Sequence, residues 1–158
     1  MKTIPLSQGK VTIVDDGDFE ELSKYKWCAS YEHDNWYATR HVRRSNGSRV
    51  NYRMHRQIMG VSDPKVFIDH INGDGLNNQR SNLRVATCSQ NGRNRGKTKD
   101  NASGWKGVSR DRNRWKARLR HEGKLIHGGH FDTPIAAAQA YNTLALRYHG
   151  EFARLNEV

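Results

Sequence analysis

The chain has 158 residues, and its 27 Lys and Arg against 16 Asp and Glu give it a net charge of +11. This excess favours a polyanionic partner, with nucleic acid ahead of an acidic membrane. No apolar run approaches the ~20 residues that a membrane-spanning helix needs, so we expect no membrane segment. Two cysteines are too few for a disulfide framework, and the residues after Met1 lack the apolar region of a signal peptide. We therefore expect a cytoplasmic protein with reduced thiols.

Residues 1–52 are predicted to be a β-rich lead-in. An acidic turn is expected at 15–18 and one helical turn at 19–22, with strands at 11–14, 25–29, 36–42 and 50–52. The aromatic residues on alternate positions are more typical of a core than of base-stacking side chains. A run of arginines from Arg40 to Arg49 is either a solvated face or a set of phosphate contacts. A short helix is expected at 52–60, with Gly60 after its end.

Residues 66–91 contain the most informative pattern. A strand at 66–68 is predicted to end in Asp69-His70, followed by a loop at 72–78 rich in Asn, Asp and Gly. A second strand is expected at 83–86, and then a helix capped by Thr87 that carries Asn91. His70, neutral near pH 7, can accept a proton from water. Asp69 and Asn91 offer the hard oxygen ligands that Mg²⁺ or Mn²⁺ prefers.

This stretch resembles the ββα-metal core of HNH nucleases, in the form found in phage and intron-borne homing endonucleases. Asn82 follows His70 by 82 − 70 = 12 residues and Asn91 by 91 − 70 = 21, as in that family's pattern. The resemblance implies His70 as general base and Asp69 and Asn91 as the metal ligands of the catalytic site. It also implies a structural role for Asn82 in pinning the loop. His55 falls in the family's lead-in, and either approaches the site or packs structurally. The text that carries the resemblance is Asp69-His70-Ile71-Asn72-Gly73, Asn82-Leu83-Arg84, Gln90-Asn91 and the segment 55–60.

Because Asn91 stands where some HNH enzymes place a third His, the resemblance implies Mg²⁺ (or Mn²⁺) as the cofactor. Basic residues then continue through Arg93, Arg95 and Lys97. We expect a basic linker at 96–103 that follows a DNA backbone.

Residues 104–158 are predicted to form three strands and one helix. Residues 114–120 alternate, with Arg114, Lys116, Arg118 and Arg120 on one face and Trp115, Ala117 and Leu119 on the other. A hairpin turn at 121–124 leads to a strand at 125–131. The helix is expected from about Pro134 to 149, with Gly150 as its cap and an apolar stripe at 135, 138, 141, 145 and 148.

This second module resembles an AP2/ERF DNA-binding domain over nearly all of 104–156. The matching text is Gly107-Val108, the strand 115–120, the segments 129–133 and 137–142, and Leu155-Asn156. In that family the sheet enters the major groove of DNA. The implied DNA contacts are Lys106, Arg110, Arg112, Arg114, Lys116, Arg118, Arg120 and His127, beside Arg93, Arg95 and Lys97 of the preceding segment.

The sequence thus predicts an α+β protein in which a β-rich scaffold leads into a ββα-metal HNH core, followed by a small AP2-like domain. The expected domains are 1–95 (lead-in 1–52, core 53–95), the linker 96–103 and the domain 104–158. The expected function is a metal-dependent endonuclease acting on double-stranded DNA as a monomer, with a dimer as the alternative, in a phage-infected bacterial cell. The rival hypotheses are a non-catalytic DNA-binding regulator with a decayed nuclease fold and an RNA-binding or RNA-cleaving protein.

Overall fold

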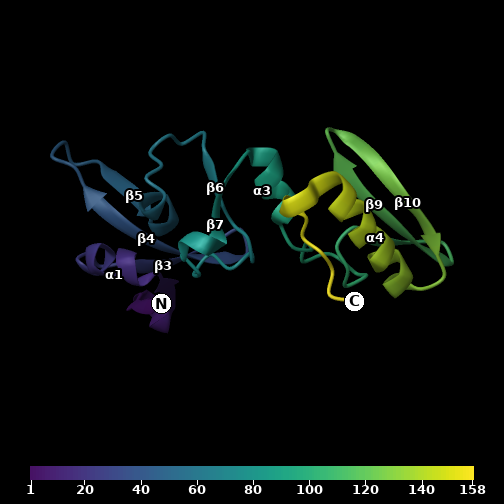
Figure 1. The fold of residues 1–158 in the computed structure, drawn as a ribbon, viewed down its shortest axis with the longest axis horizontal. Coiled ribbons are helices and arrows are strands. Elements are labelled where there is room, and N and C mark those ends of the chain that lie inside the picture. The colour runs from purple at the N-terminus through teal and green to yellow at the C-terminus, as the bar shows by residue number, and fades with distance from the viewer. The chain divides into compact units, whose positions relative to one another are not determined.

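The computed structural model describes residues 1–158 and shows a mixed α+β protein with four small antiparallel sheets and few helices (Figure 1). The predicted α+β class is confirmed. The chain divides into two compact units, Met1–Cys88 and Ser89–Val158. None of its helices has the length and apolar character needed to cross a membrane. The predicted boundaries at 95 and 103 stay predictions; residues 95–107 contain no helix or strand.

The first unit contains two hairpins and a three-stranded meander. Strands β1 and β2 pair with each other, β3, β4 and β5 pair in chain order, and β6 pairs with β7. The strands are β1 (Lys2–Pro5), β2 (Val11–Val14), β3 (Cys28–Glu32), β4 (Asn35–Arg43), β5 (Arg49–Arg53), β6 (Phe67–His70) and β7 (Leu83–Ala86). The helices are α1 (Asp16–Ser23) and α2 (Met54–Ile58), with 3₁₀ turns η1 (Ser7–Gly9) and η2 (Arg80–Asn82).

Two expectations for the lead-in are wrong in detail. The predicted acidic turn at 15–18 is mostly the first turn of α1, where Asp16 and Asp18 suit the positive end of the helix dipole. The predicted strand at 25–29 begins only at Cys28. Trp27 lies before it with 2% of its surface exposed, and its Nε1 donates to the carbonyl of Leu22 at 2.9 Å. The apolar alternation there reflects packing against the end of α1.

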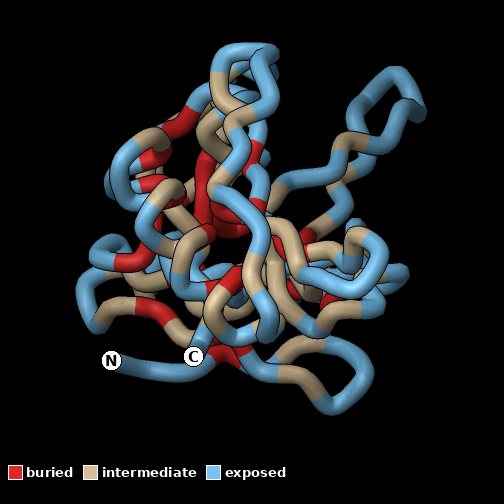
Figure 2. Tube along the Cα trace, turned by 90° about the vertical axis from the view of Figure 1, so that its right-hand side faces the viewer, coloured by how far each residue is buried: buried red, intermediate tan, exposed pale blue.

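One hydrophobic core joins the elements of this unit, and its members are red in Figure 2. It contains Ile4 and Val14 from the first hairpin, Met54 and Ile58 from α2, and Ile68 from β6. The core therefore fixes the strand that carries Asp69 and His70 against the N-terminal hairpin. The remaining members are Leu22, Trp27, Ala38 and Leu83.

The loop that follows β6 is attached to both neighbouring sheets. Ile13 of β2 accepts a backbone hydrogen bond from Asn78 at 2.8 Å and donates one to Leu76 at 2.9 Å. On the other side, a Cβ added to Gly75 would lie 2.3 Å from the carbonyl oxygen of Trp36 in β4. Only glycine permits so close an approach of two backbones. The polar loop is consequently held in one position beneath the end of β6.

The second unit is a three-stranded sheet packed against one long helix. The unit begins within α3 (Cys88–Asn94), and the strand order of its sheet is β10-β9-β8. Its elements are β8 (Val108–Asp111), β9 (Arg114–His121), β10 (Lys124–Phe131), α4 (Pro134–His149) and the turn η3 (Gly150–Phe152). The core contains Val108, Ala117, Leu119, Ala137, Ala138, Tyr141 and Ala145.

Local chemistry explains the bounds of α4. The hydroxyl of Thr133 accepts from the amide of Ala136 at 3.2 Å, Pro134 occupies the first turn, and Gly150 ends the helix at a φ of 54°. The predicted apolar stripe is wrong at its first position, because Ile135 is 52% exposed. The helix instead packs small residues such as Ala137 against the sheet, which lets the two layers approach closely.

The chain's last residues close this unit. Asn156 pairs on both sides: its Oδ1 accepts from the amide of Lys106 at 2.7 Å, and its Nδ2 donates to the Lys106 carbonyl at 3.0 Å. Its own backbone exchanges two further bonds with the side chain of Asn142 in α4, at 2.8 and 2.9 Å. One amide thus joins the start of the module to its helix.

Candidate functional site

His70 lies at the end of β6 and is only 5% exposed. Its Nε2 is 3.2 Å from Oδ1 of Asn78, in the loop that docks on β2. The ring of His55 in α2 stands edge-on to it, with centroids 5.0 Å apart and planes at 88°. The ring centroid of Tyr37 in β4 lies 6.0 Å from the ring centroid of each imidazole. Three elements distant in sequence therefore enclose one histidine.

Both histidines are held in the neutral form near pH 7. Burial lowers the pKa of His70, although the hydrogen bond to the Asn78 amide oxygen and the charges of Asp69 and Asp74 act in the opposite direction. Burial lowers the pKa of His55 to about 3, and the neighbouring His70 and the arginines Arg53 and Arg56 add to the effect. A neutral imidazole is the form that can accept a proton. The structure places His55 beside His70. Whether its role is catalytic or structural stays a prediction.

Asp69 takes part in a buried ion pair. In the β6–β7 register it lies opposite Arg84, whereas His70 lies opposite Leu83. Because successive strand residues point to opposite faces, Asp69 and His70 leave the strand on different sides. Oδ2 of Asp69 accepts from Nε of Arg84 at 2.9 Å and from Nη2 at 2.8 Å. The two side chains are 5% and 12% exposed, so the pair is well shielded from water.

Asn82 holds the loop between β6 and β7. Its Oδ1 accepts from the amide of Asn72 at 3.0 Å, and its Nδ2 donates to the Asn77 carbonyl at 2.8 Å and to Oδ1 of Asn72 at 3.0 Å. One side chain thus joins the two ends of a turn rich in Asn and Gly. These contacts are those expected of the structural role that the sequence suggested.

Asp69 and Asn91 were the predicted metal ligands. Asn91 lies on α3 and is half-buried. The structure contains no group of three or more His, Cys, Asp or Glu side chains suited to a metal ion. Carboxylate and amide oxygens are hard donors, and Mg²⁺ usually keeps several waters and binds substrate phosphate beside one or two carboxylates. The oxygen donors of Asp69 and of Asn91 each suit Mg²⁺ better than Zn²⁺.

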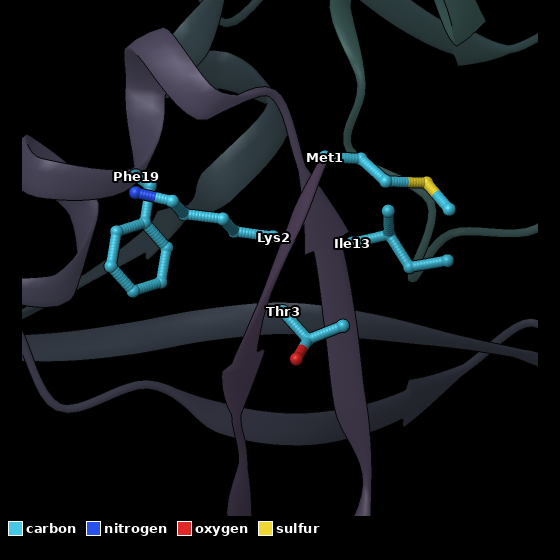
Figure 3. A pocket seen from close by; sticks show the side chains of 5 residues that line it. All are labelled: Met1, Lys2, Thr3, Ile13 and Phe19. Carbon is cyan, nitrogen blue, oxygen red and sulfur yellow. The ribbon is translucent and has the colours of Figure 1, made fainter.

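A separate pocket of about 440 Å³ lies on the first hairpin and α1, lined by Met1, Lys2, Thr3, Ile13 and Phe19 (Figure 3). It contains no histidine or carboxylate. The ammonium group of Lys2 lies 4.7 Å from the centre of the Phe19 ring, a cation–π contact that stabilises the fold. This pocket therefore lacks the groups needed for proton transfer.

The second unit presents a basic surface on the side of its sheet away from α4. Cross-strand pairing places Lys116 opposite His130 and Arg118 opposite His127. We call this surface the outer face; it consists of Arg114, Lys116, Arg118 and Arg120 of β9, His127 and His130 of β10, and Asp111 of β8.

Ion pairs divide the outer face into two ends. At one end Asp111 lies 3.3 Å from Lys116 and 3.1 Å from His130, and these two partners lower the pKa of its carboxyl group. Arg114 there pairs with Asp132 at 3.1 Å. At the other end Arg118 and Arg120 are exposed, and neither is in an ion pair. The uncompensated positive charge is concentrated at that end.

Not every predicted DNA contact belongs to the outer face. Arg110 lies opposite Trp115 and 5.6 Å from its ring centre, on the side of the sheet that holds the core. Lys106 donates to the carbonyl of Arg93 in α3, and burial, assisted by the charge of Arg154, lowers its pKa to about 8. Arg110 and Lys106 therefore do not share a surface with the arginines of β9. Strand pairing turns Arg110 to the core side of the sheet, and Lys106 is half-buried.

The other predicted contacts lie in irregular segments. Arg112 has a φ of 54° in the turn between β8 and β9, and is exposed. Arg95 and Lys97 are exposed after α3, where the ammonium of Lys97 donates to the carbonyl of Gly104 at 2.9 Å. Arg112, Arg95 and Lys97 therefore do not extend the row of basic side chains on β9.

Comparison with known proteins places these residues in a family. The HNH endonuclease family model matches residues 52–93. An uncharacterized HNH endonuclease of Acanthamoeba polyphaga mimivirus is 32% identical over 163 residues, which cover 97% of this chain and 79% of that protein. The chain belongs to the HNH endonuclease family. Protein 3.8 of Escherichia phage T7 is 34% identical over 108 residues, covering 65% of this chain and 88% of that protein. No solved structure matches the chain.

The HNH endonuclease match contains Asp69, His70 and Asn91, and the structure adds three residues to the site that the sequence analysis did not assign. Thr12 lies far outside the match, and Asn78 and Arg84 lie inside it without having been assigned a role. Thr12 and Asn78 are fully buried polar residues, which require hydrogen-bond partners. Their partners are distant in sequence, so no local pattern could have identified them.

Proposed function

We propose that this member of the HNH endonuclease family hydrolyses phosphodiester bonds of duplex DNA, with His70 as the general base. The observation that carries the proposal is the setting of His70: a buried, neutral imidazole held by Asn78 within the stretch that matches the family. A neutral base next to a polar loop is suited to deprotonating water near neutral pH.

In the proposed reaction His70 takes a proton from a water molecule as its oxygen attacks phosphorus. The bond between phosphorus and the 3′ oxygen breaks, which leaves a 3′-hydroxyl and a 5′-phosphate. Asp69 and Asn91 are the residues proposed to hold Mg²⁺ (or Mn²⁺), which when bound supplies Lewis-acid stabilisation of the phosphate charge. Asn82 keeps the loop in place, and Arg84 fixes the Asp69 carboxylate.

The second unit is proposed to dock the enzyme on DNA in the manner of an AP2-like domain. Its three-stranded sheet, single packed helix and cationic outer face support this assignment. Arg118 and Arg120 occupy the uncompensated end and can bind phosphates or base edges. With one active site per chain, a monomer nicks one strand, and a double-strand cut requires a dimer or two visits. A phage or mobile-element origin agrees with the viral and phage relatives.

The decisive experiment incubates supercoiled plasmid with the purified chain, with and without Mg²⁺. We expect Mg²⁺-dependent nicking that His70→Ala lowers by roughly 10²–10⁴-fold, the range for loss of a general base. His33→Asn is the matched control, because His33 is exposed in a turn at a φ of 51°, a conformation that Asn tolerates. Asp69→Ala and Asn91→Ala should each raise the Mg²⁺ concentration needed for nicking.

Binding of duplex DNA without nicking at any metal concentration would refute catalysis and favour a regulator with a decayed nuclease fold. Preferential cleavage of structured RNA would contradict the assignment of duplex DNA as substrate. Equal nicking by His70→Ala and the wild-type chain would exclude His70 as the base while leaving nuclease activity established.

A further inference from the structure

The ring of His70 is held by a chain of hydrogen bonds that begins in the N-terminal hairpin. Nε2 of His70 contacts Oδ1 of Asn78 at 3.2 Å, and Nδ2 of Asn78 contacts Oγ1 of Thr12 at 2.8 Å. Oγ1 of Thr12 is in turn 2.7 Å from the carbonyl oxygen of Leu76. Thr12 and Asn78 are both 0% exposed, so water does not compete for these bonds.

The direction of each bond follows from its acceptor. A backbone carbonyl only accepts, so the single hydroxyl proton of Thr12 goes to Leu76. The lone pairs of that hydroxyl then accept from the Asn78 amide nitrogen, which also faces the carbonyl of Gly75 at 3.4 Å. If the amide were turned over, its oxygen would face the Gly75 carbonyl and a hydroxyl already committed as a donor. The amide nitrogen therefore faces Thr12, and the amide oxygen faces His70.

An amide oxygen can only accept, so Nε2 of His70 carries the ring proton. In the neutral imidazole the lone pair then resides on Nδ1. We propose that Asn78 and Thr12 are positioning residues that fix the tautomer and orientation of His70, and that the N-terminal hairpin is part of the catalytic site. This inference rests on the proposed role of His70 as a general base, and it names Nδ1 as the atom that accepts the proton.

The backbone is arranged so that this chain of bonds is maintained. Ile13, next to Thr12, exchanges two backbone bonds with the loop. Asp15 accepts from the amide of Arg80 at 2.8 Å and from Nε2 of Gln79 at 3.3 Å. The hairpin thus holds the loop at several points, and Thr12 and Asn78 connect it to the imidazole through side chains. Substituting Thr12 or Asn78 therefore removes the support of the His70 ring, while the backbone bonds that hold the loop remain.

Two matched pairs of variants test the inference in the full chain. Asn78→Leu removes the acceptor, whereas Asn78→Asp keeps an acceptor oxygen toward His70. Thr12→Val removes the hydroxyl at constant shape, whereas Thr12→Ser keeps it. Nicking of supercoiled plasmid is measured at saturating DNA, together with DNA affinity and the thermal unfolding midpoint. Each pair then compares a side chain that keeps the hydrogen-bonding group with one that lacks it.

We expect Asn78→Leu to lower the nicking rate by roughly 10²–10⁴-fold, as loss of an oriented base does. Thr12→Val should lower it by roughly tenfold, because the hydroxyl's hydrogen bonds with Asn78 and with the Leu76 carbonyl are both lost. Asn78→Asp and Thr12→Ser should each nick faster than their partners, and DNA affinity should be unchanged throughout. A folded Asn78→Leu that nicks at the wild-type rate overturns the inference, as does equal nicking by Thr12→Val and Thr12→Ser.

The tautomer of His70 is also measured directly, without reference to cleavage. Long-range ¹H–¹⁵N correlation spectra at slightly alkaline pH, assigned with His70→Gln, should show a protonated Nε2 in the wild-type chain. The spectrum of Asn78→Leu should show a smaller Nε2-protonated fraction than that of the wild-type chain. An Nδ1-protonated ring in the wild-type chain overturns the inference even if nicking is normal. Absence of nicking with the expected spectrum would instead refute the proposed function, while the positioning of His70 stands.

Discussion

Arg84 directs two hydrogen bonds at a single oxygen of Asp69, Oδ2, from Nε at 2.9 Å and from Nη2 at 2.8 Å. The pair joins β6 to β7, which lie opposite each other at these two positions, and both side chains are almost fully buried. Charges taken so far out of water depend on each other, since removing one leaves the other unpaired in a medium of low polarity.

Arg84→Met should therefore destabilise the first unit by about 3–5 kcal/mol, the usual effect of breaking a buried ion pair. Arg80→Met is the matched control, because Arg80 pairs with Asp18 at 2.7 Å while 56% of its own side chain is exposed. Exposed pairs contribute about 0–1 kcal/mol. Urea unfolding followed by tryptophan fluorescence measures both, and similar losses in the two variants would contradict the importance of burial.

Gly75→Ala should disturb the loop beneath β6. The added Cβ would meet the Trp36 carbonyl at 2.3 Å and the Tyr37 ring at 2.7 Å, so the loop must move away from β4. We expect a loss of stability of about 1–3 kcal/mol, as for other overpacked sites, and slower nicking because Asn78 moves with the loop. Gly17→Ala in α1 is the control, since nothing lies within 4 Å of its added Cβ and alanine favours a helix.

Acid should destabilise the first unit partly through His55. The unfolded chain binds a proton on His55 as the pH falls below 6.5, whereas the folded chain does so only near the folded-state pKa of about 3. Between these values the unfolded state binds more protons, so stability decreases as the pH falls, by up to about 1.4 kcal/mol per pH unit for one group. His55→Phe should have a shallower pH dependence than the wild-type chain. Parallel curves of unfolding free energy against pH would show that His55 does not contribute.

Arg118 and Arg120 should matter for DNA affinity more than Arg114. Arg114 already pairs with Asp132 and donates to the carbonyl of His130, whereas the other two are in no ion pair. Loss of a base contact lowers affinity by about 1–3 kcal/mol and relaxes preference at that position, while loss of a phosphate contact reduces the slope of log K against log salt by about 0.9. Binding of a pooled duplex library at several salt concentrations separates the two outcomes. A larger effect of Arg114→Ala than of Arg118→Ala would place the main DNA contact at the Asp111 end of the outer face instead.

Sequence patterns predicted the elements whose signals are local. β4, the β9–β10 hairpin, the end of α2 before Gly60 and the cap of α4 at Thr133 all follow from alternation, turn residues or capping residues. The same patterns failed at Trp27 and Ile135. In both places an apolar residue fits the period of an element, but tertiary packing determines whether it is in the strand or in the core.

The candidate site was only half visible in the sequence. Asp69, His70 and Asn82 stand at recognisable spacings, so their presence could be predicted. Thr12 and Arg84 could not be assigned, because their contacts depend on which backbones the fold brings together; Thr12 and Asn78 are 66 positions apart. On the outer face, too, only the local part of the pattern could be predicted. Alternation predicted the row of basic residues on β9. The register of β8 with β9 places Asp111 beside Lys116 at one end and turns Arg110 to the opposite side of the sheet.

The attachment of the loop to β2 has a practical meaning for protein engineering. A graft of residues 52–94 into another scaffold would carry the whole stretch that matches the nuclease family, yet it would leave behind Thr12 and the two backbone bonds of Ile13. The transplanted imidazole would lose its support and sample both tautomers. The smallest transferable unit of this enzyme is therefore larger than its signature, and begins with the hairpin at the start of the chain.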